Sequence, residues 1–237
     1  MLDGSLRDLE KLIGYEFKDK ELLLLALTHS SYSHELMITG GEKRNNERLE
    51  FLGDAVLELI SSEFLFRNYT HLPEGELSKL RASLVSETPL ADCARQIFLD
   101  KYVLVGKGEK LNHGNEKDSI LSDAFESIIG ATYLDGGLEP ARAFVESYVL
   151  NDIEHKKRFY DAKTELQVMV QNLYQCVPEY EVISESGSPH DMTFTVEVRI
   201  CGKPYGTGEG RSKKQAQQKA AYAAIVKMEK EKEQKDE

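Results

Sequence analysis

The sequence lacks a long apolar run. Nothing in its 237 residues approaches the roughly 20 consecutive apolar residues that a membrane-spanning helix needs. The first residues, Met1 to Ser5, also lack the basic segment and apolar stretch of an export signal. These two absences argue against a membrane-spanning or exported protein, and we expect a cytoplasmic location.

Cysteine is scarce. Cys93, Cys176 and Cys201 are odd in number, lie far apart and include no CxxC pair. A disulfide-stapled scaffold or a zinc site would require paired, closely spaced cysteines. We therefore expect three reduced thiols.

Positively charged residues are fewer than negatively charged ones, so the formal net charge is −11. Such a balance argues against a nucleic-acid partner when the chain is taken as a whole. Its distribution changes that view. Residues 1–160 hold 19 positive and 28 negative side chains, whereas residues 161–237 hold 11 and 13. The second part also contains a local basic run, Arg211 to Lys219, so position matters more than net charge.

The hydrophobic pattern divides the chain into two parts. Across residues 1–150, apolar positions recur every three or four residues between glycine- and proline-containing loops, which predicts an all-helical domain. Residues 151–160 are polar and carry little pattern, so we interpret them as a linker. Residues 161–230 predict a helix, three strands with alternating apolar positions and a closing helix, in the order α-β-β-β-α. The strands are expected at 180–183, 194–200 and 203–208, the last helix at 212–227, and a frayed charged tail at 231–237. The fold class is thus α+β.

Four carboxylates carry the strongest chemical signal. Glu50 and Asp54 lie four residues apart, and hence on one face of a predicted helix. Asp123 and Glu126 project from a second helix that is apolar over most of its circumference, where uncompensated carboxylates are costly. An isolated acidic pair is more often a solvated helix face. Two pairs on packed helices can instead converge on Mg²⁺ or Mn²⁺, which prefer oxygen ligands.

Two glycines bear on that convergence. Gly53 and Gly130 occur on the two acid-bearing helices and lack side chains, so they would allow the helices to approach closely. Simple tolerance of glycine at these positions is an equally good interpretation of the sequence alone.

The residues around these acids form ordered motifs. Asn46 to Leu57 reads NERLEFLGDAVL; the further motifs are residues 73–85, residues 106–109 and residues 123–137. All four resemble the blocks of the ribonuclease III family, in the same order and spacing. The resemblance implies a catalytic set of Glu50, Asp54, Asp123 and Glu126, of which Glu50, Asp123 and Glu126 would bind Mg²⁺, with Mn²⁺ as a substitute. Residues 113–118 depart from the glycine- and arginine-rich loop usual in relatives, which affects local RNA contacts.

This resemblance also implies an activity. Family members hydrolyse double-stranded RNA with metal assistance and without a covalent intermediate, leaving 5′-phosphate and 3′-hydroxyl ends. Ribosomal RNA precursors and structured messenger RNAs are the implied substrates. One carboxylate cluster cuts one strand, so cutting both strands implies a homodimer. We expect Phe51 to make an apolar contact across that interface, and ordinary core packing is its alternative.

Residues 161–230 resemble a double-stranded RNA-binding domain. Lys163, Thr164, Leu166, Gln167, Pro189, His190 and the segment from Gly206 to Ala216 carry the match. The implied RNA contacts are Thr164, Gln167, His190, Arg211, Lys213 and Lys214. The two lysines would lie at a helix N-terminus, where amides and cationic side chains both face phosphates. In isolation such lysines indicate only a solvated helix face. Val168 replaces the glutamate usual in relatives.

Three other functions compete with a nuclease. A catalytically silent double-stranded RNA binder would share the fold, but it would lack one or more of the four acids. A purely structural helical dimer leaves the buried carboxylates and the basic helix unexplained. A Ser/His hydrolase built from His29, Ser30, Ser31 and His34 lacks the glycine pattern of a nucleophile elbow. We therefore predict an active endoribonuclease.

Overall fold

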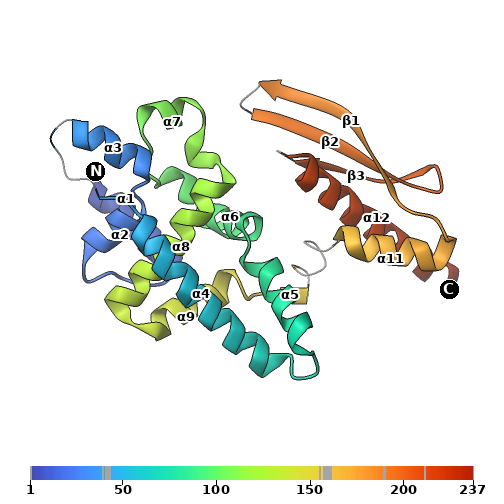
Figure 1. Cartoon of the computed structure of the whole chain (residues 1–237), viewed down its shortest axis with the longest axis horizontal. Helices are drawn as coiled ribbons and strands as arrows, with labels where there is room; N and C mark the ends of the chain where they lie inside the picture. Colours follow the sequence, from blue (N-terminus) through green and yellow to red (C-terminus); the bar gives the residue numbers. More distant parts are fainter. Residues whose placement is uncertain are drawn as a thin grey trace. The chain divides into compact units, whose positions relative to one another are not determined.

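The chain folds into two compact units, Met1–Ile153 and Glu154–Glu237. The structure is a computed structural model, and it describes residues 2–38, 40, 44–154, 156, 162–188, 191–210 and 212–236 (Figure 1). The predicted His190 and Arg211 contacts lie outside the described residues, as do several positions of the predicted linker. No helix in these ranges is both long enough and apolar enough to cross a membrane.

The first unit is built from helices, as its apolar periodicity predicts. The α-helices are α1 (Leu2–Ile13), α2 (Lys20–Ala26), α3 (Ser30–Ile38), α4 (Glu47–Asn68), α5 (Glu74–Val85), α6 (Glu87–Gln96), α7 (Lys107–Leu111), α8 (Asp118–Gly136) and α9 (Leu138–Tyr148). Two 3₁₀ turns, η1 (Leu99–Lys101) and η2 (Gly114–Glu116), lie before and after α7.

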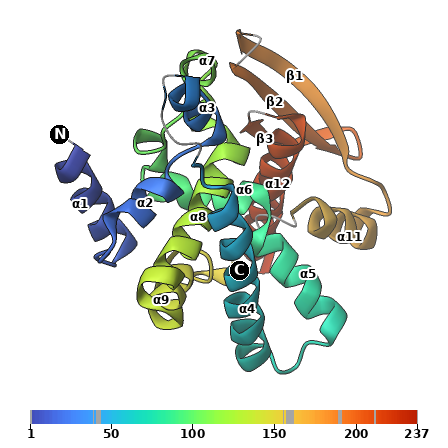
Figure 2. The same cartoon turned by 60° about the vertical axis from the view of Figure 1, so that its left-hand side comes forward.

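Helix α8 forms the centre of this unit. Its buried positions surround most of the helix, and its Phe125 ring packs on Phe144 of α9 with ring centroids 4.9 Å apart. Helix α4 makes the most extensive contact with α8 among the described elements, and the two run side by side in Figures 1 and 2. Burial of this apolar surface is the main source of stability for the unit.

Gly53 and Gly130 bring α4 and α8 into backbone contact. A Cβ atom at Gly53 would overlap the carbonyl oxygen of Glu126, and one at Gly130 would overlap that of Leu49. The same Gly53 Cβ would lie 3.1 Å from the backbone nitrogen of Gly130. Close approach, and not mere tolerance of glycine, is therefore the interpretation that the structure confirms.

The second unit has the predicted α-β-β-β-α order. It comprises α11 (Ala162–Tyr174), β1 (Glu179–Ser188), β2 (Asp191–Ile200), β3 (Lys203–Gly210) and α12 (Lys213–Asp236). The strands form an antiparallel sheet in the order β1-β2-β3. Val196 and Val198 of β2 share one buried cluster with Leu166 of α11 and with Ala220 of α12, so both helices contribute to the core beside the sheet.

The strands β1 and β2 extend further than the alternation of apolar residues predicts. Their pairing continues to Ser188 and Asp191, through a stretch without regular apolar alternation. Backbone hydrogen bonds hold this extension, and they do not depend on which side chains are apolar. The register also shifts between Val182 and Ser184, which interrupts the period of two.

The predicted frayed tail is wrong over most of its length, because α12 continues as helix to Asp236. Met228 is buried, and the Tyr205 hydroxyl donates to Glu231 Oε2 at 3.5 Å, so the sheet supports the helix beyond its predicted end. The residues that follow are mainly Glu and Lys, which are strong helix formers and occur at spacings of four that favour helix.

The prediction of three reduced thiols is also wrong. Cys93 is free and buried, but Cys176 and Cys201 form a disulfide, with their Cα atoms 6.1 Å apart. The two cysteines are 25 residues apart in sequence. The fold of the second unit brings the segment after α11 beside the turn between β2 and β3, and spacing alone does not reveal that juxtaposition.

The backbone contact between α4 and α8 leads to a stability prediction. Gly53→Ala should lower the free energy of unfolding of the first unit by at least about 3 kcal/mol, because the new methyl group meets backbone that cannot rotate away. For a domain of this size, the calorimetric unfolding temperature should then fall by roughly 6–12 °C. Gly75→Ala is the matched control, since an added Cβ there meets nothing within 4 Å. An unchanged unfolding temperature in Gly53→Ala would show that the two helices do not touch at this point.

Candidate metal centre

The acid-bearing faces of α4 and α8 meet next to the Gly53 contact. Glu50 lies one turn before Gly53 on α4, and Glu126 supplies the backbone carbonyl that Gly53 touches. The Ser127 hydroxyl donates to the backbone carbonyl of Asn46 at 3.2 Å, which ties the start of α4 to α8. The helix contact thus fixes the positions of the side chains that project beside it.

Three of the four predicted acids converge. Glu50, Asp123 and Glu126 each offer a carboxylate oxygen, and these oxygens all lie within 4.8 Å of one another. All three residues are half-buried. Asp54, the fourth predicted acid, is exposed and outside this group of three, although its charge acts on both Glu126 and Glu50.

Glu126 shows the strongest electrostatic effect in the cluster. Burial, followed by the charges of Asp54, Asp123 and Glu50, raises the pKa of Glu126 to about 8. Burial makes the charged form costly, and the neighbouring carboxylates add like-charge repulsion. Without a cation, this side chain therefore holds its proton near neutral pH.

The pKa values of the other two acids, Glu50 and Asp123, are also raised. Burial, then the charges of Asp123, Glu47 and Asp54, raises the pKa of Glu50. Burial likewise raises the pKa of Asp123, whereas interaction with His29 and a hydrogen bond from Ser122 lower it.

Three residues that the sequence analysis did not assign to the cluster therefore affect the pKa values of its acids. Glu47 acts on Glu50, and Glu87 and His29 act on Asp123. Glu47 lies one helical turn before Glu50, which its spacing could have revealed. Glu87 and His29 come from distant segments, and no spacing rule places them here.

The cluster fits a divalent cation of the hard, oxygen-preferring kind. Three carboxylate oxygens converge, and within the described part of the chain no Lys or Arg forms an ion pair with any of them. From the sequence alone, either a cation or neighbouring basic side chains could compensate the repulsion between the carboxylates. The absence of such ion pairs in the described residues favours a cation. Mg²⁺ and Mn²⁺ take such ligands, because their affinity for carboxylate oxygen is high.

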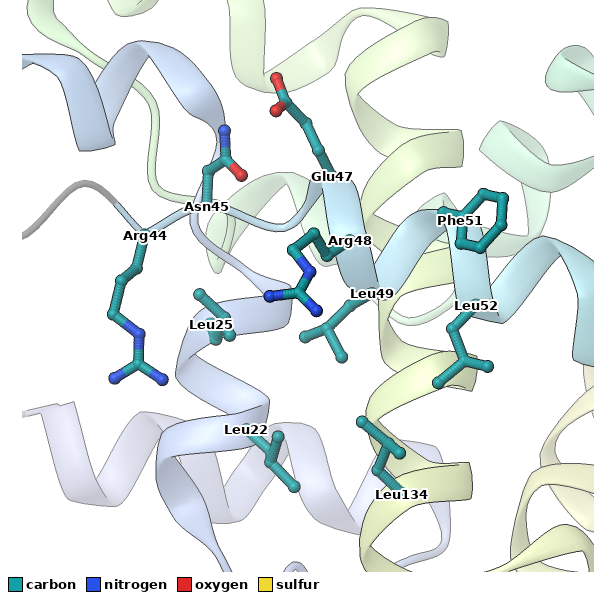
Figure 3. Close-up of a pocket in the computed structure, with 10 residues that line it drawn as sticks. All are labelled: Leu22, Leu25, Arg44, Asn45, Glu47, Arg48, Leu49, Phe51, Leu52 and Leu134. Atoms are coloured by element: carbon teal, nitrogen blue, oxygen red, sulfur yellow. The ribbon is translucent and has the colours of Figure 1, made fainter.

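Phe51 lies on α4, next to Glu50 in the sequence, and its side chain faces outward. Its side chain is 80% exposed, so it does not belong to the core of its own unit. It borders a pocket of about 750 Å³ whose apolar wall is formed by Leu22, Leu25, Leu49, Leu52 and Leu134. Figure 3 shows Leu22, Leu25, Leu49 and Leu134 converging on one space beside α4.

The second unit presents the predicted RNA contacts on α11 and α12. Thr164 and Gln167 are exposed on α11, and Lys213 and Lys214 are exposed in the first turn of α12. Lys213 Nζ lies 3.0 Å from Glu185 Oε1 and 5.3 Å from the centre of the Phe194 ring. Glu185 and Phe194 pair across β1 and β2, so the sheet positions this lysine at the helix start.

The atypical loop at residues 113–118 is held by ion pairs. Lys117 pairs with Glu109 of α7, and Arg95 of α6 pairs with Asp118 at the start of α8. His113 has a positive backbone φ of 51°, which residues other than glycine seldom adopt outside turns. These ion pairs give the loop a defined path.

Comparison with known families gives two matches along the chain. A model described as Ribonuclease-III-like matches residues 19–153, and the double-stranded RNA binding motif matches residues 162–228. The first match covers more than half of the sequence and includes all four predicted acids.

Individual relatives match over almost the whole chain. The sequence is 46% identical to Ribonuclease 3 of Caldanaerobacter subterraneus subsp. tengcongensis, over 93% of this chain and 96% of the relative. It is 42% identical to Ribonuclease 3 of Pseudothermotoga lettingae, over 93% of this chain and 94% of the relative. The crystal structure of the ribonuclease III nuclease domain from Campylobacter jejuni matches with a TM-score of 0.55 and 47% identity, covering 60% of this chain and 92% of that one. Together with the two motif matches, these likenesses place the chain in the ribonuclease III family, as an endoribonuclease with a C-terminal double-stranded RNA-binding domain.

Proposed function

We propose that this protein is a Mg²⁺-dependent endonuclease that hydrolyses both strands of double-stranded RNA. The observation that carries the proposal is the convergence of Glu50, Asp123 and Glu126 in a chain of this family. These three side chains would hold the cation, and Mn²⁺ would replace Mg²⁺ because it accepts the same oxygen ligands.

The four acids would have two different parts in the reaction. When bound, the cation lowers the pKa of water and stabilises negative charge on the phosphate. Glu50, Asp123 and Glu126 orient it, and their loss of protons is coupled to its binding. Asp54 is exposed beside Glu126, where its carboxylate can orient the attacking water and accept its proton. Attack on phosphorus with departure of the 3′ oxygen leaves 5′-phosphate and 3′-hydroxyl ends.

Removing one charge from the cluster tests this assignment. Glu126→Gln should lower the cleavage rate of long double-stranded RNA in Mg²⁺ by at least about 100-fold, because a ligand carboxylate is lost. Gel-shift affinity for the same RNA should stay close to that of the wild type. Glu146→Gln, a substitution at an exposed position on α9, is the matched control and should cut normally.

An EDTA arm and a Mn²⁺ arm complete that experiment. Chelation should abolish cleavage by the wild type, and added Mg²⁺ or Mn²⁺ should restore it. If the wild type binds RNA but cuts it with neither cation, the protein is a silent double-stranded RNA binder, and the catalytic assignment is wrong.

The raised pKa values also predict how stability depends on pH in EDTA. Between the ordinary pKa of Glu126, 4.5, and its folded value of about 8, the folded state holds more protons than the unfolded state. Stability therefore falls as pH rises through this window, by on the order of 3 kcal/mol. Chemical denaturation from pH 5 to pH 8.5 should show this loss, and Glu126→Gln should reduce it. An equal pH slope in the two proteins would contradict the burial of this carboxyl.

The second unit would supply most of the affinity for double-stranded RNA. Thr164 and Gln167 on α11 and Lys213 and Lys214 on α12 are exposed, and the two lysines lie where the helix amides also face solvent. His190 and Arg211 complete the proposed set. Contacts of this kind recognise phosphates and the shape of A-form RNA, and they carry little sequence information.

A homodimer would place two catalytic clusters on one duplex. A second C. jejuni nuclease-domain structure, 47% identical to this chain, is described as structurally flexible in a region involved in dimer formation. In this chain, the exposed Phe51 lies beside the leucine-lined pocket. A two-fold axis would let each Phe51 enter the pocket of the other copy, because an isologous interface repeats every contact.

Phe51 therefore provides a test of assembly. Phe51→Ala should raise the dimer dissociation constant by at least about 30-fold, since each interface loses two buried aromatic contacts. Sedimentation equilibrium measures this directly. Phe66→Ala is the control, because Phe66 lies on the same helix and is also exposed, at 74%, but does not line this pocket. Equal dissociation constants for the Phe51 variant and the wild type would exclude this interface.

The cellular role follows from the proposed activity. We expect cytoplasmic processing of ribosomal RNA precursors and of structured messenger RNAs, because both contain extended duplexes. Shape recognition by the second unit is compatible with both kinds of substrate.

A further inference from the structure

The disulfide between Cys176 and Cys201 has no part in the proposed mechanism. The two cysteines are 25 residues apart, and the segment between them contains all of β1 and β2. The remaining cysteine, Cys93, lies in the first unit, where its buried thiol donates to the backbone carbonyl of Tyr148 at 3.1 Å. The Cys176–Cys201 bond is therefore a feature of the RNA-binding unit alone.

Cys201 occupies a turn position that ordinarily favours other residues. Cys201 and Gly202 form the two-residue connection between β2 and β3, and their φ angles are 48° and 77°. Positive φ at both positions is the pattern of a type I′ hairpin turn, in which asparagine, aspartate or glycine usually comes first. The turn itself therefore does not account for a cysteine. What the side chain does at this position is to cross-link to Cys176, whose Cα atom lies 6.1 Å away.

The segment around Cys176 contributes little to the core of the second unit. Gln175 ends α11 in a left-handed conformation, with a φ of 55°. In residues 171–177, all of which the structure describes, Cys176 is half-buried and every other residue is exposed. The side chain of Tyr174 hydrogen-bonds to Tyr205 of β3, but Tyr174 is exposed and water competes for this bond. The disulfide is thus the covalent attachment of a segment that burial alone holds weakly.

The exposure of the two cysteines determines from which side the bond can be opened. Cys201 is exposed, whereas Cys176 is half-buried. An external thiolate would therefore attack the Cys201 sulfur, form a mixed disulfide with it and release Cys176 as a thiolate. A second thiol would attack the external sulfur of the mixed disulfide and release Cys201. The two cysteines take up the protons of the two incoming thiols, which leave joined as one disulfide, so two electrons pass to the protein.

Opening the bond would remove a large constraint on the unfolded chain. A cross-link over a loop of this length disfavours the unfolded state by a factor on the order of 100–400. The second unit has a small core, in which four of the buried residues are alanines of α12. Domains of roughly 70–80 residues seldom have stability in excess. The state of this bond therefore determines much of the stability of the second unit.

We propose that the Cys176–Cys201 bond is a thiol–disulfide exchange site, and that thiols acting on it set the stability of the second unit and thereby its affinity for double-stranded RNA. The reagent class is a small thiol or a dithiol protein that reaches the bond from the Cys201 side. In a compartment rich in thiols, such as the cytoplasm expected above, a disulfide is usually transient or redox-sensing. The part that concerns affinity rests on the RNA contacts proposed above, whereas the exchange site does not.

The exchange site can be tested on the full chain without any variant. Oxidised glutathione should close the bond, and dithiothreitol, a dithiol, should open it in the folded protein. Alkylation with iodoacetamide after the dithiothreitol step, read by mass spectrometry, should label Cys176 and Cys201 and leave the buried Cys93 unlabelled. A bond that opens only after unfolding would be a purely structural disulfide. Thiols that oxidised glutathione does not join would show that no bond forms. Either result overturns the proposal.

Amide hydrogen exchange measures the stability of each unit within the same chain. The readout is the exchange of Val196 and Val198, which are buried in the middle strand β2. Reduction should speed their exchange by on the order of 100-fold or more, because the unfolded second unit regains the freedom that the cross-link removes. The amides of α8 in the first unit should not change. Equal rates for β2 in the oxidised and reduced protein would contradict the proposed control of stability.

Three cysteine substitutions assign the effect to this bond. The double variant Cys176→Ser, Cys201→Ser should exchange at the rates of the reduced wild type, with or without dithiothreitol. Cys93→Ser is the matched control and should respond to dithiothreitol as the wild type does. A response to dithiothreitol that persists in the double variant would show that another group carries it.

Gel-shift measurements then connect the bond to RNA binding. At a temperature at which the reduced second unit is about 90% unfolded and the oxidised one is folded, reduction should raise the Kd for a long duplex by about 10-fold. The double variant Lys213→Gln, Lys214→Gln, measured in the oxidised state, should weaken binding by itself. Normal binding by this variant would remove the proposed RNA contacts and leave the exchange site in place. Weak binding by the variant, together with a Kd of the wild type that does not depend on its redox state, would show that the bond does not control affinity.

Discussion

The backbone contact between α4 and α8 sets the geometry on which the rest of the first unit depends. Helices separated by side chains usually pack 8–10 Å apart. Gly53 and Gly130 remove the two side chains that would keep these helices apart. Glu50 on one helix and Glu126 on the other can therefore reach a common point. Leu49 and Phe125 bury their side chains around this contact, so core packing and the position of the acids have one origin.

The convergence of the acids also changes their protonation, because it is unfavourable for all three to be charged. Three half-buried carboxylates repel one another, and the pKa of each is raised above its ordinary value, with burial as the first cause. A site with this property is poorly stabilised when empty and gains most from a divalent cation, because the cation replaces protons on the same oxygens. The acids thus make the local fold weaker at the point where, on the proposed function, the cation would bind.

Much of this arrangement could be predicted from residue patterns, and the remainder has identifiable physical reasons. Helical periodicity and the spacing of Glu50, Asp54, Asp123 and Glu126 indicated two acid-bearing helices, and the structure brings three of those acids together. The role of Gly53 was undecided, because a sequence does not show what faces a missing side chain. The Cys176–Cys201 disulfide and the influence of His29 on Asp123 depend on tertiary contacts between distant segments. The extended α12 was missed because charged residues indicate solvent exposure but do not exclude helix.

The charge distribution fits a division of labour between the two units. A chain with a net charge of −11 repels RNA at long range, and residues 1–160 contain most of the acidic excess. In the proposed function, attraction would come from local features: the exposed lysines at the start of α12, and a cation held by the carboxylate cluster. Each acts within about a Debye length, roughly 8–10 Å at physiological salt. On the same proposal, Lys213 and Lys214 would retain a duplex whether or not the cluster holds a cation. On the proposed function, cleavage would require the cation as well, because without it the phosphate would face the acidic cluster directly.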